Sequence, residues 1–379
     1  MKVAIVHDYL NQYGGAERVV EELAGLFPEA PIFTSIYDAG RVNNRFVGRD
    51  IRTSFMQRLP GVMGHHQIYL PLYPLAFDRF KLDGYDLVIS SSSAWGKAAI
   101  TGPDTLHLSY CHAPMRFAWQ SADYMQREQL GRASRTLLPA VLYFIRRWDI
   151  KTALRPNFYI ANSQTVANRI QKFWGREADI VINPPVEVKN FAYHKRPRED
   201  FYLTVGRLVP YKRLDVTVQA FRDLDLPLKV VGSGRDLESL RKLAGPRTEF
   251  LGHIGDQEVR ELYSRCRAFV QTGSEDFGIT PIEAMGGGAP VIAINSDGPA
   301  ETIVDGQTGI FFDAQTPEAL AQAVRRFEQI HSGFDSAAIR CYAESFDRSI
   351  FRQRFQAYVE LKWEQFQTRK QSNRLVSVN

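Results

Sequence analysis

The sequence has few cysteines and lacks several common catalytic motifs. Its three cysteines, Cys111, Cys266 and Cys341, are far apart and odd in number. They provide neither a disulfide framework nor a CxxC metal site, so we expect a reducing compartment. The sequence also contains no HExxH, no phosphate-binding P-loop and no GxSxG. These absences argue against zinc proteases, P-loop nucleotidases and serine hydrolases of the GxSxG type.

The sequence also lacks a hydrophobic run that could span a bilayer. Its longest apolar run, from Leu137 to Ile145, is interrupted by Pro139 and is shorter than the roughly 20 residues that a membrane-spanning helix needs. The N-terminal run MKVAIVHDYL is broken by His7 and Asp8, whereas a signal peptide has a longer apolar stretch and a cleavage site. We expect this run to form the first strand of the fold.

The composition that remains is that of a globular protein, with 44% hydrophobic and 23% charged residues among 379. A chain of this length exceeds one typical domain of roughly 100 to 200 residues, so we expect two domains.

The net charge of +5 is concentrated in the N-terminal half. Residues 41–82 and 130–155 are rich in arginine and lysine and hold few acidic residues. The second stretch also carries large apolar residues, which are Leu137, Leu138, Val141, Leu142, Phe144, Ile145 and Trp148. This mixture is typical of a helix that lies in an anionic membrane surface, and it fits equally well a core helix with a solvated basic face. No nucleic-acid motif accompanies the charge, so we expect no nucleic-acid partner.

Short apolar runs alternate with helical patterns along the chain. The runs are Lys2–Val6, Leu87–Ser90, Leu106–Tyr110, Phe158–Ala161, Phe201–Val205, Leu228–Val231, Ala268–Gln271 and Val291–Ile294. Continuous apolar strands separated by helices imply parallel sheets that are covered on both faces, so the predicted fold class is α/β. The first and fifth of these runs each lead through glycine into a helix, so each is expected to begin a Rossmann-like domain.

The segment from Asn183, NPPVEVKNFAYHKRPRED, opens with two prolines and has mixed charge, which is typical of a linker. We therefore predict an N-terminal domain at residues 1–185 and a C-terminal domain at residues 186–345. Residues 346–379 are predicted to form an aromatic helix that packs back toward the N-terminal domain, followed by a frayed polar tail from Thr368.

The segment SEDFGITPIEAMGGGAPVIA, from Ser274, carries the signals of a helix start. Thr280 is a suitable N-cap, Pro281 follows it, and Glu283 lies three residues after the cap. The preceding loop, residues 276–279, would direct backbone N–H groups and the positive end of the helix toward an anionic or polyhydroxyl ligand. The local pattern is equally consistent with a capping role for Glu283 and a solvated loop position for Glu275.

The segment GRLVPYKR, residues 206–213, directly follows a predicted strand. Arg207 and Lys212 are therefore expected at the carboxyl end of a sheet, where two cations can neutralise a departing diphosphate in place of a metal ion. Ordinary solvated loop charges are the alternative.

Three weaker signals involve glycines and one histidine. Gly14 and Gly15 precede a helix and would allow a phosphate or sugar close to the backbone. The Gly232-Ser233-Gly234 run lacks the third glycine of a dinucleotide fingerprint, so we predict no NAD site. His112 follows a predicted strand, where it would either bond a sugar oxygen or serve a structural role.

Taken together, these stretches resemble the retaining glycosyltransferases of family 4, which have the two-domain GT-B fold with an interdomain cleft. The similarity covers most of the chain and is strongest from Tyr202 to Asp313. Glu275 and Glu283 match the family's E-x7-E signature, which is followed by AMGGGAPVIA and by PAETIVDGQTGIFF.

The resemblance implies a role for each matching residue. Arg207 and Lys212 would clamp the diphosphate, Glu275 would hold the transferring sugar, and Glu283 would bind the ribose hydroxyls. His112 matches the family's histidine near the reacting sugar. The other donor-binding positions that the resemblance implies are Gly14, Gly15, Gly206, His253, Ile254, Phe277, Gly278, Ile279 and Thr280.

The N-terminal half is most similar to bacterial O-antigen and exopolysaccharide mannosyltransferases, through VHDYLNQYGGAERVVEELAGLFPEAPIFTSIYD, YDLVISSSSAWGKA and YCHAPMRFAW. This similarity implies transfer of mannose from GDP-mannose to a polyprenyl-diphosphate-linked oligosaccharide, with retention of configuration and without a metal or other cofactor. We expect a cytoplasmic protein attached peripherally to the inner membrane. The alternatives are a UDP-sugar donor, a sugar-nucleotide epimerase or hydrolase on the same architecture, and a non-enzymatic scaffold that binds sugar nucleotides.

Overall fold

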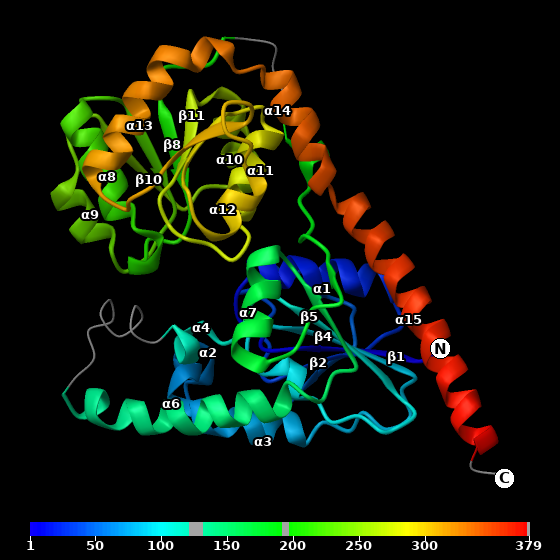
Figure 1. The fold of residues 1–379 in the computed structure, drawn as a ribbon. Coiled ribbons are helices and arrows are strands. Elements are labelled where there is room, and N and C mark those ends of the chain that lie inside the picture. Colours follow the sequence, from blue (N-terminus) through cyan, green and yellow to red (C-terminus); the bar gives the residue numbers. More distant parts are fainter. Residues whose placement is uncertain (121–131, 192–196, 377–379) are drawn as a thin grey trace. The chain divides into compact units, whose positions relative to one another are not determined.

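The computed structural model describes residues 1–120, 132–191 and 197–376, which form two compact units (Figure 1). The first unit contains the described residues of Met1–Ala122, Leu130–Pro185 and Ser349–Asn379. The second unit contains those of Val186–Arg348. The chain therefore leaves the first unit after Pro185 and returns to it after Arg348.

The described part of the first unit has seven parallel strands in the order β3-β2-β1-β4-β5-β6-β7. The strands are β1 (Val3–His7), β2 (Ile32–Thr34), β3 (Ile51–Thr53), β4 (Leu87–Ser92), β5 (Leu106–Cys111), β6 (Phe158–Ala161) and β7 (Ile180–Val181). The helices are α1 (Gly15–Leu26), α2 (Val62–His65), α3 (Tyr73–Asp78), α4 (Arg116–Trp119), α6 (Arg132–Thr152), α7 (Gln164–Trp174) and α15 (Arg348–Val376), with 3-10 turns η1 (Phe55–Arg58), η2 (His66–Leu72) and η3 (Gly96–Ala98).

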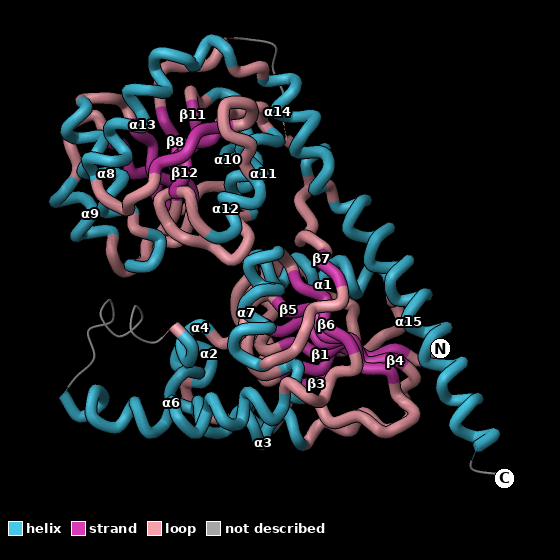
Figure 2. Tube along the Cα trace, in the orientation of Figure 1, coloured by secondary structure: helices cyan, strands magenta, loops and turns pink. Residues whose placement is uncertain are grey.

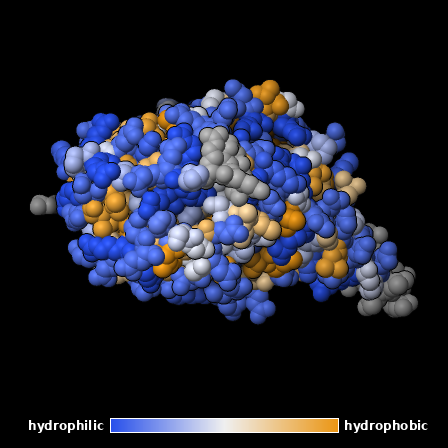
Figure 3. All heavy atoms as spheres, turned by 90° about the horizontal axis from the view of Figure 1, so that it is seen from above, coloured by the Kyte–Doolittle hydropathy of each residue, from blue (hydrophilic) through white to orange (hydrophobic). Residues whose placement is uncertain are grey.

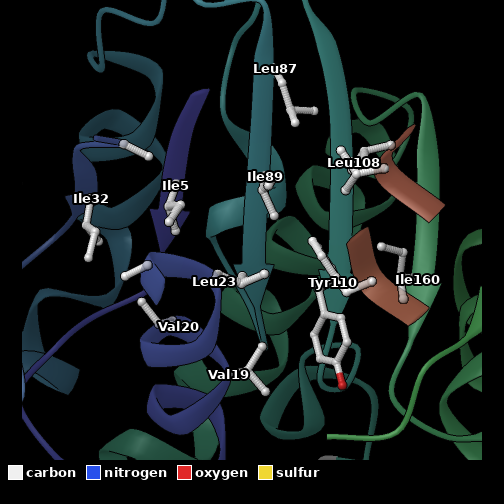
Figure 4. Packing of buried hydrophobic residues seen from close by; sticks show 14 of the residues in the cluster. Ile5, Val19, Val20, Leu23, Ile32, Leu87, Ile89, Leu108, Tyr110 and Ile160 are labelled. Carbon is white, nitrogen blue, oxygen red and sulfur yellow. The ribbon is translucent and has the colours of Figure 1, made fainter. Parts of the chain in front are cut away.

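Both faces of this sheet are buried, which explains why its strands are continuous apolar runs. Figure 4 shows the face on which Ile5 and Ile89 lie beside Val20 and Leu23 of α1, with Leu108 farther along the same face near Ile160. Aromatic residues of α15 belong to the same buried cluster, namely Phe351, Phe355 and Tyr358. The opposite face packs against α3 and α6.

The described part of the second unit has six parallel strands in the order β10-β9-β8-β11-β12-β13, of which β8, β11 and β12 are labelled in Figure 2. They are β8 (Tyr202–Val205), β9 (Leu228–Val231), β10 (Thr248–Gly252), β11 (Ala268–Gln271), β12 (Val291–Ile294) and β13 (Gly309–Phe312). The helices are α8 (Leu214–Leu224), α9 (Leu237–Leu243), α10 (Asp256–Arg265), α11 (Ile279–Gly286), α12 (Asp297–Thr302), α13 (Pro317–Ile330) and α14 (Ser336–Ala343), with 3-10 turns η4 (Val188–Asn190), η5 (Pro210–Lys212), η6 (His331–Gly333) and η7 (Glu344–Phe346). Two buried clusters cover the two faces of this sheet.

Each sheet has a point at which the strand order reverses. In the first unit the reversal lies between β1 and β4, and in the second it lies between β8 and β11. In open parallel sheets, ligands bind outside the carboxyl ends of the strands at such a point. The loops that follow these four strands are therefore the places to look for a functional site.

The predicted α/β class with parallel sheets is confirmed, and the predicted strands occur within two residues of their expected ends. The segment interpreted as a linker contains the point at which the chain passes to the second unit, and its Val186, Val188 and Phe191 belong to a buried cluster of that unit. One local expectation is wrong. The tail expected to fray from Thr368 is helical as far as Val376, because the tail is rich in residues that favour helix.

The surface face seen in Figure 3 is mostly hydrophilic, and its hydrophobic residues form small groups. None of the helices in the described ranges combines the length and the hydrophobicity that crossing a bilayer requires.

Candidate functional site

The loop after β8 carries Arg207, and two glycines of a neighbouring loop fix its path. A Cβ on Gly232 would lie 1.9 Å from the backbone oxygen of Gly206, and one on Gly234 would lie 2.1 Å from that of Leu208. Only glycine fits at either position, since real Cβ atoms do not approach so closely. The run first compared with a dinucleotide fingerprint therefore packs the Arg207 loop against the end of β9.

Lys212, in η5, forms an ion pair with Glu275, which lies in the loop after β11. Their side chains are 16% and 17% exposed, so the pair is largely shielded from water. Gly273 makes the approach of the two loops possible, because a Cβ there would lie 2.9 Å from the Lys212 backbone. The Thr272 hydroxyl also donates to the backbone oxygens of Lys212 and Arg213, at 3.2 and 2.9 Å. Two residues 63 positions apart are thus brought into contact.

The electrostatics of this pair keep the lysine charged. Burial would lower the pKa of the Lys212 ammonium, but the Glu275 carboxylate and the Tyr211 phenol outweigh burial and raise the pKa above its ordinary value. The Glu275 Oε1 atom also lies 3.4 Å from Nε2 of Gln271. The Lys212 ammonium has three N–H donors, so it can bind a second anion while it remains on Glu275.

Arg207 is exposed and lies beside Tyr211, a residue that the sequence did not single out. A terminal guanidinium nitrogen of Arg207 donates to the Tyr211 hydroxyl at 2.7 Å. The centroid of the Tyr211 ring is 5.9 Å from the Arg207 guanidinium carbon and 5.7 Å from Nζ of Lys212. The ring therefore holds both predicted cations near one another, where they can act together on an anion. A Cβ on Gly206 would lie 3.9 Å from Cε and 4.0 Å from Nζ of Lys212.

Helix α11 starts two residues earlier than the sequence predicts. Its N-cap is Gly278, in the left-handed conformation with φ 88°, so Ile279 and Thr280 are its first two residues. The proposed N-cap role of Thr280 is therefore wrong, because Gly278 adopts a backbone conformation that only glycine reaches easily and makes the chain turn there. The first N–H groups of the helix have no carbonyl partner within it, as at any helix start.

Gly298 fixes the loop that precedes α11. A Cβ there would lie 2.2 Å from the backbone oxygen of Phe277. The Gly298 N–H also donates to the backbone oxygen of Glu275 at 2.9 Å. The segment from Glu275 to Phe277 is thus held against α12.

Glu283 does not complete a capping box, which was the alternative interpretation of its position. Its carboxylate is 8% exposed and accepts a hydrogen bond from the Tyr263 hydroxyl at 3.3 Å. His253 and Ile254 follow β10, which β9 separates from β8 in the sheet. His253 is exposed, whereas Ile254 packs partly against the core.

In the first unit, Gly14 is the N-cap of α1 and Gly15 is the first residue of the helix. The Gly14 N–H donates to Oε2 of Glu17 at 2.8 Å, so the side chain of Glu17 occupies this donor. Glu17 is itself buried, with 2% of its surface exposed. Of the two glycines, Gly15 is therefore better placed to offer its N–H to a ligand.

His112 lies directly after β5, at the same edge of the sheet as Gly14 and Gly15. Its Nε2 is 2.7 Å from the hydroxyl oxygen of Ser91, at the end of β4. Burial and, to a smaller extent, the nearby His7 lower the pKa of His112 to about 3, so the imidazole is neutral at physiological pH. Asn162 donates to its backbone oxygen at 2.9 Å and fixes the main chain.

His7 and Asp8, at the end of β1, are buried polar residues whose roles the sequence did not predict. Burial would lower the pKa of His7, but Glu17, 3.8 Å from its Nε2, outweighs burial and raises the pKa. The Asp8 carboxylate accepts the backbone N–H groups of residues 93–96 at 2.6 to 2.9 Å and the Ser92 hydroxyl at 3.0 Å. In the sequence, the local sign of these buried contacts is that His7 and Asp8 interrupt the first apolar run.

Helix α6 has one buried and one exposed apolar face. Leu142 and Ile145 are buried, whereas Tyr143 and Phe144 are 55% and 69% exposed. The acidic residue of this stretch, Asp149, is fully buried and paired with a buried lysine. It therefore does not offset the basic charge at the surface.

In the part of the chain that the structure describes, no group of three or more His, Cys, Asp or Glu side chains is arranged to hold a metal ion. Arg207 and Lys212 are positive groups that the structure places at the edge formed by β8 and β11.

Comparison with known proteins gives consistent matches. A family model described as glycosyl transferases group 1 matches residues 186–337. The alpha-1,3/1,6-mannosyltransferase ALG2 of Dictyostelium discoideum is 31% identical over 373 residues, which covers 82% of this chain and 85% of that protein. A GDP-mannose-dependent alpha-mannosyltransferase of Mycolicibacterium smegmatis is 34% identical over 174 residues, which covers 43% of this chain and 45% of that protein, so this match spans less than half of the relative.

Among solved structures, Anabaena Alr3699/HepE in complex with UDP has a similar fold. The TM-score is 0.71 at 17% identity, over 95% of this chain and 100% of that one. At this identity the likeness concerns the fold alone.

Proposed function

Because the chain belongs to the group 1 glycosyl transferases, enzymes of the family 4 type with the GT-B fold, we propose that it transfers mannose from GDP-mannose to a polyprenyl-diphosphate-linked oligosaccharide, with retention of configuration. The names of its mannosyltransferase relatives support mannose, and the mycobacterial relative supports GDP-mannose. The UDP bound by the Anabaena protein makes a UDP-sugar the alternative donor.

The observation that carries this proposal is the shielded Lys212–Glu275 pair at the carboxyl ends of neighbouring strands. A glycosyl–diphosphate bond that breaks leaves negative charge on the diphosphate oxygens. Lys212 and Arg207 stabilise that charge, as preorganised cations do in a site of low dielectric. No metal ion is required in this mechanism.

Glu275 binds the transferring sugar in this proposal. Its Oε1 atom faces Lys212 and Gln271, so Oε2 is the atom that we assign to a sugar hydroxyl. Glu283 binds the ribose hydroxyls, and the N–H groups at the start of α11 line the diphosphate. We assign Gly15 and His112 to donor binding, as the family resemblance implies, and residues 252–254 to the base of the nucleotide.

The acceptor hydroxyl attacks on the leaving-group face, and the departing diphosphate takes its proton. The bond from the anomeric carbon to the diphosphate oxygen breaks as the new bond to the acceptor oxygen forms, so no protein nucleophile takes part.

An assay with labelled GDP-mannose and a polyprenyl-diphosphate-linked acceptor tests the function. We expect a glycolipid product that depends on the acceptor, and the same assay with UDP-sugars should give little product. Donor turnover without acceptor would instead indicate an epimerase or hydrolase. Donor binding without any turnover would indicate a scaffold.

We also propose that the first unit attaches to an anionic membrane surface through α6. The exposed Tyr143 and Phe144 and the basic residues Arg146, Arg147 and Lys151 on the same helix support this attachment. Phe144→Asp should greatly reduce co-sedimentation with anionic vesicles at low salt. Leu361→Asp, at a site on α15 that is 49% exposed, is the matched control and should sediment normally. Absence of vesicle binding by the wild-type protein at low salt would contradict the proposal.

A further inference from the structure

Four buried polar residues from separate elements are connected through side-chain and backbone contacts at the carboxyl edge of the first sheet. Glu17 of α1 lies 3.8 Å from His7 of β1. His7 contacts the backbone oxygen of Ser91 in β4 through Nδ1 at 2.8 Å, and the Ser91 hydroxyl contacts His112. The exposed fractions are 2% for Glu17, 2% for His7, 0% for Ser91 and 8% for His112. The chain ends at the histidine that the proposed function assigns to the sugar nucleotide.

The first link fixes the proton positions on His7. The Ser91 backbone oxygen can only accept, so Nδ1 of His7 must donate to it. Its Nε2 faces the Glu17 carboxylate, and the raised pKa of His7 is consistent with a proton on that nitrogen too. His7 therefore donates to Ser91 through Nδ1 and faces Glu17 through Nε2, and the centroid of its ring lies 6.4 Å from that of His112.

The second link fixes the proton position on His112. For the fully buried Ser91 hydroxyl, the one contact recorded in the described residues is with Nε2 of His112. If this hydroxyl accepted, its own proton would be buried without an acceptor, and buried unpaired donors are rarer and more costly than unpaired acceptor lone pairs. The hydroxyl therefore donates to Nε2, and the ring proton of the neutral His112 lies on Nδ1.

We propose that Ser91 is a positioning residue that holds His112 as the Nδ1–H tautomer, so that His112 presents an N–H donor to an oxygen of the bound sugar nucleotide. This inference rests on the proposed function for the identity of the ligand. The arrangement of Glu17, His7 and Ser91 does not depend on it. The N–H group of His112 would stabilise an oxygen that gains negative charge as the bond from the sugar to the diphosphate breaks. Its loss should therefore lower mainly kcat.

The strand offers a matched control for Ser91. Ser90, one residue earlier in β4, makes the same kind of contact, with its hydroxyl 2.9 Å from Nε2 of His107. His107 is fully buried and is not one of the residues that we place in the site. Ser90→Ala thus removes an equivalent serine–histidine bond from the same strand, without touching His112.

The first experiment compares transfer kinetics of the full-length wild type, Ser91→Ala, His112→Ala, the double variant and Ser90→Ala. We expect Ser91→Ala to lower kcat by on the order of tenfold with little change in the donor KM. The double variant should be no slower than His112→Ala, because Ser91 acts through His112. Ser90→Ala should retain the wild-type kcat. Losses that multiply in the double variant, or an equal loss in Ser90→Ala, would overturn the proposal.

The second experiment needs no activity. Histidine labelled with 15N reports by NMR which ring nitrogen of His112 carries the proton, with the resonance assigned through His112→Ala. We expect an unprotonated Nε2 in the wild type and protonation of Nε2 in Ser91→Ala. A protonated Nε2 in the wild type would overturn the inference about Ser91. If His112→Ala transferred sugar at the wild-type rate, the assignment of His112 to the ligand would fail, and the NMR result would decide the tautomer independently.

Discussion

Replacement of Lys212 by alanine tests the charge stabilisation on which the proposed chemistry depends. A unit charge about 4 Å from a phosphate oxygen contributes about 4 kcal/mol at an effective dielectric constant of about 20. Lys212 already interacts with Glu275 in the free protein, so the net gain on the developing charge is smaller. We expect a loss of about 2 to 4 kcal/mol in transition-state stabilisation, which corresponds to a loss of roughly 30- to 1000-fold in kcat/KM.

The assay is acceptor-dependent transfer at saturating and limiting donor, with thermal unfolding as a check on the fold. Lys229→Ala is the matched control, because Lys229 lies in β9 of the same unit, is 29% exposed, and pairs with a carboxylate at 3.7 Å. It should transfer normally. A folded Lys212→Ala protein with kcat/KM within about threefold of wild type would refute the reasoning, since that factor is under 1 kcal/mol.

Two further predictions concern backbone packing and pH. Gly298→Ala should destabilise the protein by about 1 to 3 kcal/mol or more and weaken nucleotide binding, because its Cβ would lie 2.2 Å from a backbone oxygen. Gly255→Ala, where a Cβ meets nothing within 4 Å, is the control, and equal urea midpoints for the two variants would contradict this prediction. Burial lowers the pKa values of His107 and His112 to about 3. These lowered pKa values do not reduce the free energy of unfolding above about pH 6.5, but at pH 5 each reduces it by about 2 kcal/mol. The raised pKa of His7 has the opposite effect. Its contribution to the free energy of unfolding is fully present below about pH 6.5 and is lost as the pH rises through the pKa of His7 in the folded protein. Urea unfolding should show a net loss of stability from pH 7.5 to pH 5, and an unchanged or higher stability at pH 5 would count against these assignments.

The sequence predicted the sheets well because strands buried on both faces are short apolar runs. The positions of the strands then also predicted the positions of the loops that follow them. The E-x7-E spacing placed Glu275 and Glu283 on either side of the start of α11, as the structure has them. The sequence also placed Lys212 after a strand, but only the structure pairs it with Glu275.

Local pattern failed where distant residues or unusual backbone angles decide the structure. Thr280 was a reasonable N-cap by residue type, but the left-handed Gly278 determines the start of the helix. The contacts that join His7 to Ser91 and Ser91 to His112 span 84 and 21 residues. No local pattern could have matched them, because they arise from the pairing of β1, β4 and β5.

The central claim is that fixed side-chain cations, rather than a bound metal ion, stabilise the departing diphosphate. The most direct measurement is acceptor-dependent transfer after exhaustive treatment with a chelator, followed by addition of magnesium or manganese. We predict that the treated enzyme keeps its full rate and that neither ion increases it. Loss of transfer with the chelator and its return only with an added divalent ion would contradict the claim.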